Sequence, residues 1–370
     1  MTTYPTAPRL PSLLLARDHT RATLRRLVGE RPHFRAGPGA YAESVTGPAW
    51  QVREHQALAG IAATRGRLGD QVVISHASAA RVHGLWVPPW DGRTHVTGPS
   101  APGRQSAYLQ RHVAELGADE VLEIDGLRVT TISRTILDCA LRLGPRWGLA
   151  VADSGFRILV RPSREDPGAH LSRQEAIRGH LLDWLGRDFR CCPGLPTAIP
   201  VVSLANGLCE SSGESGLIWS AVANGAPEPE RQYPVHAEGI GYFLDAAWEF
   251  PLSAWTADEP RRPRTTRGGL IVIGEEYDGE LKYAQDGDPR REVLREKTRQ
   301  DRLLQRNVFL QRRTHVDLRD PARLGREILA RLPRRIALAA RPIPGLLALP
   351  PDTTRPRLRA PFGPNPRVWS

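Results

Sequence analysis

Three acidic residues lie where two predicted strands would bring them to one edge of a sheet. Asp245 belongs to the apolar stretch 241–248, while Glu276 and Asp278 end the apolar stretch that begins at residue 270. Because side chains alternate along a strand, Glu276 and Asp278 share one face. Converging carboxylates repel one another, and a hard cation such as Mg²⁺ (or Mn²⁺) relieves that repulsion. Such an ion could activate water against a phosphodiester.

Both lysines of the chain follow these acids. Of 51 basic residues, only Lys282 and Lys297 are lysines, and the other 49 are arginines. A compact ammonium group can orient an attacking water or stabilise developing negative charge, so we expect one of the two lysines to serve the site. Lys282 lies four residues beyond Asp278, and Lys297 lies on the next predicted helix, which begins at Asp288-Pro289.

The acids also admit interpretations without a metal. Glu276 and Asp278 could form surface salt bridges with neighbouring arginines. A glycosidase-type carboxylate pair is disfavoured, because no aromatic and polar residues are arranged as a sugar platform. His76 and His83 lie seven residues apart on one face of another predicted helix. Without a third ligand near them in the sequence, we interpret these histidines as surface or packing residues.

The basic residues are concentrated in the last part of the chain. The formal net charge is +11, from 51 basic and 40 acidic residues. Residues 289–370 hold 19 Arg and one Lys against seven acids, an excess of +13, so residues 1–288 carry −2. Such a segment is typical of proteins that neutralise DNA phosphates. The candidate phosphate contacts are Arg291, Arg295, Arg299, Arg312 and Arg313. A solvated, proline-rich tail is the alternative for residues 341–370.

The composition excludes several protein classes. No run of about 18 uninterrupted apolar residues is present, which argues against a membrane-spanning helix. The N-terminus lacks a basic region followed by a long hydrophobic core, so we expect no signal peptide. The four cysteines show no CxxC spacing, which favours reduced thiols over a zinc site. Together these features predict a cytoplasmic protein without a membrane partner.

The predicted elements give an α/β (α+β) chain of four parts. Residues 1–48 contain a helix and then a basic, glycine-containing stretch, the pattern of a degenerate winged helix. Residues 49–205 alternate helices and strands, which predicts a mixed α/β middle domain that acts as scaffold or partner surface. Residues 206–335 carry the acids, and residues 336–370 form a Pro/Arg-rich tail.

The third part resembles a nuclease family. Asp245, the segment Glu276-Tyr277-Asp278-Gly279 and a basic helix that ends at Asn307 before the strand 308–312 resemble the PD-(D/E)XK nuclease superfamily, and especially its very-short-patch-repair-like endonuclease domains. The resemblance implies a restriction-endonuclease-like domain over residues 206–335, with a central mixed sheet flanked by helices. It implies these metal ligands: Asp245, Glu276 and Glu214. The family's lysine falls at Asp278, so Lys282 or Lys297 would act from a shifted position.

A second resemblance covers roughly residues 15–320. Its motifs are Ser75-His76-Ala77-Ser78-Ala79-Ala80, Arg134-Thr135-Ile136-Leu137-Asp138-Cys139-Ala140, a Glu-Ser-x-x-Glu segment that ends at Glu214, and the segment from Glu276 to Lys282-Tyr283. These resemble actinobacterial proteins grouped with abortive-infection type IV antitoxins. The resemblance implies a winged helix that binds promoter DNA and, as partner, a nucleotidyltransferase toxin.

Two functions therefore compete. The acids and the basic C-terminal segment predict a magnesium-dependent DNA endonuclease-like protein that hydrolyses phosphodiester bonds. The alternative is a DNA-binding antitoxin or transcriptional regulator in which the nuclease fold is inactive.

Overall fold

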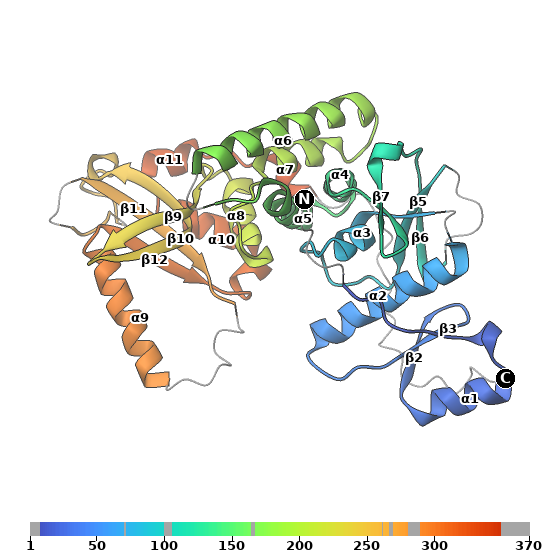
Figure 1. Ribbon diagram of the computed structural model, residues 1–370. Helices are drawn as coiled ribbons and strands as arrows, with labels where there is room; N and C mark the ends of the chain where they lie inside the picture. The colour runs from blue at the N-terminus through green and yellow to red at the C-terminus, as the bar shows by residue number, and fades with distance from the viewer. Residues whose placement is uncertain are drawn as a thin grey trace. The chain divides into compact units, whose positions relative to one another are not determined.

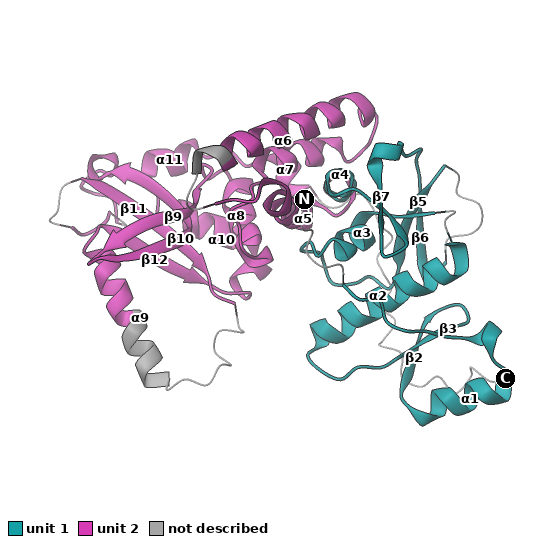
Figure 2. Cartoon of the chain, in the orientation of Figure 1, with its two compact units in different colours: residues 1–139, 350–370 teal, residues 140–349 magenta. Residues whose placement is uncertain are grey.

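The computed structural model describes residues 8–69, 72–99, 106–163, 167–260, 262–265, 269–279 and 289–348, with the backbone alone at 167–169 and 289–296. The chain divides into two compact units, residues 1–139 with 350–370 and residues 140–349 (Figure 2). The finer boundaries near residues 48, 205 and 335 stay predictions. Among the described residues, no helix is long and apolar enough to cross a membrane.

Unit 1 begins with one helix and a small sheet (Figure 1). Its elements are β1 (Leu14–Leu15), the 3-10 helix η1 (Ala16–Asp18), α1 (Arg21–Glu30), β2 (His33–Gly37) and β3 (Ala40–Glu43). The sheet has the order β1-β3-β2, and Gly39 takes the left-handed φ of +69° that the hairpin turn requires. Small side chains, among them Ala36 and Ala42, pack this sheet against Ala59 of α2 (Ala49–Leu68). The predicted helix-and-hairpin pattern is confirmed.

A five-stranded sheet forms the rest of unit 1, in the order β6-β5-β4-β8-β7. Its elements are β4 (Val73–Ile74), α3 (His76–Val82), β5 (Thr94–Gly98), β6 (Leu109–Val113), η3 (Ala118–Glu120), β7 (Val121–Ile124), β8 (Leu127–Thr130) and α4 (Ile132–Arg142). Asp125 and Gly126 both have positive φ in the β7–β8 turn, as a tight hairpin requires. Helix α2 contributes Leu58 and Ile61 to the core of this sheet.

Helices and a four-stranded sheet make up unit 2. The helices are α5 (Pro145–Val160), α6 (Pro167–Asp188), α7 (Leu195–Leu204), α8 (Ser212–Ala223), α9 (Pro289–Leu304), α10 (Pro321–Leu329), α11 (Arg334–Ala339) and α12 (Pro344–Leu347), with the 3-10 helices η4 (Leu252–Ala254) and η6 (Asp317–Arg319). The strands are β9 (Glu230–Ala237), β10 (Ile240–Pro251), β11 (Leu270–Tyr277) and β12 (Val308–Arg313), in the order β12-β11-β10-β9. The expected α/β fold is confirmed.

The sheet of unit 2 is mixed, and helices cover both of its faces. Strands β9, β10 and β11 are antiparallel neighbours, whereas β12 runs parallel to β11 and needs the crossover that α9 supplies. Leu303 of α9 packs with Val272 and Val308 on one face. Side chains alternate along a strand, so Glu275 points to the face of the sheet opposite to Val272. On that face Arg313 links Glu275 to Glu327 of α10.

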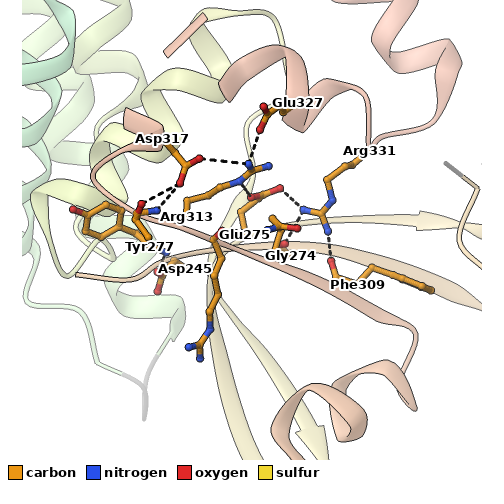
Figure 3. Close-up of polar contacts among 12 residues, drawn as sticks. Asp245, Gly274, Glu275, Tyr277, Phe309, Arg313, Asp317, Glu327 and Arg331 are labelled. Atoms are coloured by element: carbon orange, nitrogen blue, oxygen red, sulfur yellow. Dashed lines mark hydrogen bonds and ion pairs between the residues drawn. The ribbon is translucent and has the colours of Figure 1, made fainter. Parts of the chain in front are cut away.

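Glu275 is the centre of a buried ion cluster (Figure 3). It is fully buried, and Arg313 donates from Nε to its Oε2 at 2.7 Å, while Arg331 donates to its Oε1. Arg331 also donates to the carbonyl oxygens of Gly274 and Phe309, and Arg313 binds Glu327 of α10 at 2.7 Å. The cluster therefore ties β11, β12 and the end of α10 together.

Removing one arginine of this cluster should destabilise unit 2. Breaking a buried ion pair leaves charge without compensation, so we expect Arg331→Met to lower the free energy of unfolding by about 3 kcal/mol in urea titrations followed by circular dichroism. Arg326→Met, at an exposed position of α10, is the matched control and should cost less than about 0.5 kcal/mol. Equal losses in the two variants would contradict the role given to Glu275.

Candidate functional site

The sheet brings two of the predicted acids together. Ala246 pairs with Glu275, which places Asp245 beside Glu276 across the two strands. Asp245 is half-buried, and its Oδ2 accepts a hydrogen bond from the backbone N–H of Tyr277 at 2.8 Å. This bond fixes the carboxylate at the end of β11. The expectation that Asp245 reaches the edge that carries Glu276 is therefore met in the described structure.

Arginines neutralise Glu276 and Asp278. Arg299 of α9 donates to both oxygens of Glu276, from Nη1 to Oε2 at 2.9 Å and from Nη2 to Oε1. Arg312 of β12 lies between the two acids, with Nε 3.8 Å from Glu276 Oε2 and Nη1 3.3 Å from Asp278 Oδ2. Both residues are 9% exposed. Glu276 and Asp278 share one face, as strand alternation predicted. They pair with arginines, as the alternative interpretation expected, but these ion pairs are largely buried rather than on the surface.

Glu214 lies at the start of α8 and approaches Asp245 from there. Its N–H donates to the Ser211 hydroxyl at 3.2 Å, and its own carboxylate accepts from Glu210 N at 2.8 Å, which caps the helix. Gln232 Nε2 is 3.4 Å from Glu214 Oε2. Burial, together with the negative charge of Asp245, raises the pKa of Glu214 from 4.5 to about 7. Glu214 and Asp245 are therefore an interacting carboxylate pair.

The backbone next to this pair is irregular. In the pairing of β9 with β10, Tyr233 pairs with Leu244 and Arg231 pairs with Ala246, but the register leaves out Gln232 and Asp245 between them. Gln232 has a φ of +51°. A glutamine rarely adopts this left-handed conformation, and such strain is enriched at functional sites. Sequence reasoning missed Gln232, because nothing in an apolar strand pattern marks a single residue with inverted φ.

The predicted magnesium ligands do not assemble into one site. Within the described part of the chain, no group of three or more His, Cys, Asp or Glu side chains is placed to hold a metal ion. Glu276 uses both oxygens to bind Arg299, so it does not fit a ligand set with Asp245 and Glu214. The described residues show a Glu214–Asp245 pair beside an arginine-bound Glu276, and the magnesium site itself stays a prediction.

Among the described residues, the cation that binds Glu276 is an arginine. Lys282 lies outside the described residues. Lys297 is exposed on α9, whereas Arg299, two positions further, contacts Glu276. Residues two apart on a helix point in nearly opposite directions, since each residue turns the helix by about 100°. Lys297 is therefore not the cation that contacts Glu276, and the expectation for Lys282 stays a prediction.

Three of the arginines expected to contact phosphates make internal contacts instead. Arg299 and Arg312 bind the acids of β11, and Arg313 is 6% exposed between Glu275 and Glu327. Arg313 in particular faces the interior of unit 2, so it is not available to DNA. The side chains of Arg291 and Arg295 lie outside the described part of the structure. Several arginines of the basic C-terminal segment therefore form ion pairs within unit 2.

A basic surface is present instead on the first helix. Residues 8–48 carry seven arginines against three acids, a local charge of +4 that is hidden when residues 1–288 are counted together. On α1, Leu24 is buried, while Arg21 and Arg25 are exposed one turn apart. Arg35 is exposed on the adjacent hairpin. Counting charge for each small unit would have revealed this surface from the sequence.

The Glu214–Asp245 pair should make stability depend on pH. A carboxyl group with a raised pKa stabilises the fold fully below its unfolded value of 4.5, and this contribution is lost as the pH rises through about 7. From pH 5 to 8 we expect the free energy of unfolding to fall by about 2 kcal/mol more in the wild type than in Glu214→Gln. Urea titrations at both pH values measure this, with Glu210→Gln as the control. A slope that survives in Glu214→Gln would contradict the assignment.

Comparison with known proteins gives limited similarity. No family model matches the chain, and no curated protein sequence matches it. Among solved structures, the chain is similar to the crystal structure of the RV2827C protein from Mycobacterium tuberculosis, at 14% sequence identity and a TM-score of 0.30 over 52% of this chain and 76% of that one. A likeness at this level assigns neither fold nor function, so the geometry of this chain carries the functional argument.

Proposed function

We propose that this protein is a DNA-binding regulator that contacts DNA through α1 and the β2–β3 hairpin. The observation that carries the proposal is the order of these elements: a helix, then a hairpin, with β1 added beside β3. In winged-helix proteins such a helix enters the major groove and the hairpin lies along the sugar-phosphate backbone. Figure 1 shows α1 beside the hairpin.

The exposed arginines suit this role. Arg21 and Arg25 lie one turn apart, so they project from the same face of α1. Guanidinium groups can pair with guanine edges through two hydrogen bonds or with phosphates, and Arg35 of the hairpin is placed for a phosphate contact. The Thr20 hydroxyl caps α1 by accepting from Thr23 N at 3.2 Å, which holds the start of the helix in place.

The acidic site supports regulation rather than cleavage. The order helix–strand–strand–strand–helix–strand from α8 to β12 supports the proposed nuclease-like ancestry of this part. Glu276 is bound by Arg299, and an acid, Asp278, occupies the position that the resemblance gives to a lysine. We therefore propose a nuclease-like domain without catalysis. The partner implied by the antitoxin resemblance is a nucleotidyltransferase toxin, whose gene would lie beside that of this protein.

DNA affinity should depend on the arginines of α1. We expect Arg21→Ala/Arg25→Ala to weaken binding to the duplex upstream of its own coding sequence by at least about tenfold, and to reduce the salt slope of log K by about 2, because two charge contacts are lost. Fluorescence anisotropy over a salt series without Mg²⁺ measures both. Arg187→Ala/Arg190→Ala removes the same charge from exposed positions of unit 2. If this control lost as much affinity, α1 would not be the DNA contact.

An endonuclease is the second candidate, and the Glu214–Asp245 pair favours it, because ionised neighbouring carboxylates attract divalent cations. Plasmid incubated with Mg²⁺ or Mn²⁺ separates the two functions. We expect no more nicking by the wild type than by Asp245→Ala/Glu276→Ala. Nicking that needs the metal and disappears in the double variant would replace the regulator with a nuclease.

A further inference from the structure

Arg35 of the β2–β3 hairpin lies against a tyrosine of the five-stranded sheet. The Cζ atom of Arg35 is 5.7 Å from the centroid of the Tyr108 ring, which is within the range of a cation–π contact. Tyr108 directly precedes β6, and its backbone oxygen accepts a hydrogen bond from Thr94 N of β5 at 2.9 Å. Both sheets belong to unit 1. The five-stranded sheet therefore supplies a fixed aromatic surface for the arginine of the hairpin.

The backbone of the hairpin gives this side chain a second contact. The register of β2 against β3 shifts between Arg35 and Gly37, and such an irregularity changes the direction of a side chain. Arg35 Nε donates to the carbonyl oxygen of Gly37 at 3.3 Å. One nitrogen of the guanidinium is thus bound to the backbone while its carbon lies over the Tyr108 ring. Together the two contacts fix the plane of the guanidinium group.

The end of the guanidinium group remains available to a ligand. Among the described residues, neither Nη group of Arg35 forms a hydrogen bond or an ion pair, and Arg35 is exposed. The two Nη groups of an arginine present parallel N–H donors, which match two oxygens of one phosphate. The contacts with Gly37 and Tyr108 therefore leave open the edge that binds a phosphate.

No acid of residues 8–69 pairs with Arg35. This stretch contains four acids, and each lies 3.1–3.7 Å from another arginine: Asp18 from Arg17, Glu30 from Arg26, Glu43 from Arg31 and Glu54 from Arg81. The acids of this stretch are therefore balanced by other cations. The positive charge of Arg35 is left for an anion from outside the chain.

We propose that Tyr108 is a positioning residue for DNA binding, whose ring holds Arg35 ready for one phosphate of the duplex. A long side chain loses conformational freedom when it binds, and a contact that exists before binding reduces this loss. The inference rests on the proposed DNA contact through α1 and the hairpin. It extends that contact, because it gives the five-stranded sheet a part in recognition without a contact between Tyr108 and DNA.

A double-mutant cycle on Arg35 and Tyr108 tests this role in the full chain. The measurement is fluorescence anisotropy over a salt series with the duplex upstream of the protein's own coding sequence. We expect Tyr108→Leu to weaken binding about two- to fivefold without changing the salt slope of log K, because no charge contact is lost. Arg35→Ala should lower that slope by about 1. In the Arg35→Ala background, Tyr108→Leu should have no further effect.

Two controls separate positioning from other effects. Tyr108→Phe keeps the aromatic ring, so it should bind within about twofold of the wild type. An unrelated duplex of equal length should lose affinity by the same factor in Tyr108→Leu, since a phosphate contact carries no base sequence. A ring that only supports the fold would instead weaken binding whether or not Arg35 is present.

The outcomes that overturn the inference differ from those that overturn the proposed function. Equal affinity of Tyr108→Leu and the wild type, or an equal loss with and without Arg35, would overturn the role of Tyr108. A salt slope unchanged in Arg35→Ala would also overturn it, while a loss in Arg21→Ala/Arg25→Ala would leave the contact through α1 in place. A wild type that binds neither duplex would overturn both.

The wild type alone gives a second readout if Tyr108→Leu does not fold. Nuclear Overhauser contacts between the Arg35 side chain and the Tyr108 ring report their proximity in solution. We expect these contacts both in the free protein and in its complex with the duplex. Their loss when DNA binds would overturn the proposal, because the ring would then not hold Arg35 against the phosphate.

Discussion

The burial of one carboxylate, Glu275, determines the geometry of unit 2. A fully buried negative charge needs compensation, and two guanidinium groups supply it, Arg313 from β12 and Arg331 from the segment after α10. This contact fixes which face of β11 is internal. Because alternate residues face opposite ways, Glu276 must then point to the face covered by α9, where Arg299 meets it. The acidic site is thus a consequence of where Glu275 is held.

The same requirement explains the charge of the C-terminal part. Its arginines outnumber its acids, yet Arg299, Arg302, Arg312, Arg313, Arg323 and Arg331 all pair with carboxylates of unit 2. Several of those carboxylates belong to strands and turns before residue 289, so counting charge by sequence separates partners that the fold brings together. An excess of basic residues in one segment therefore describes an internal balance as much as a surface for DNA. On α1, by contrast, the exposed arginines outnumber nearby acids within one small module.

Features that depend on neighbouring residues could be predicted from the sequence, whereas contacts between residues far apart in the sequence could not. Strand alternation placed Glu276 with Asp278, and the helix-and-hairpin pattern of the first 48 residues needed only neighbouring residues. Arg299, the partner of Glu276, lies 23 residues away on a helix. Whether Lys297 or Arg299 reaches Glu276 depends on which side of that helix faces the sheet, and the sequence alone does not give this orientation. His95 and His112 stack because β5 and β6 pair in parallel, and no spacing in the sequence encodes that pairing.

The kind of cation at Glu276 decides what this site can do. A lysine ammonium is a point charge that would leave one carboxylate oxygen open to a metal ion, whereas the planar guanidinium of Arg299 binds both oxygens at once. The Cζ atom of Arg299 also lies 5.5 Å from the centroid of the Tyr242 ring, and this cation–π contact holds the guanidinium group in place. The guanidinium of Arg299 therefore balances the charge of Glu276, whereas the Glu214–Asp245 pair keeps an acidic character beside it.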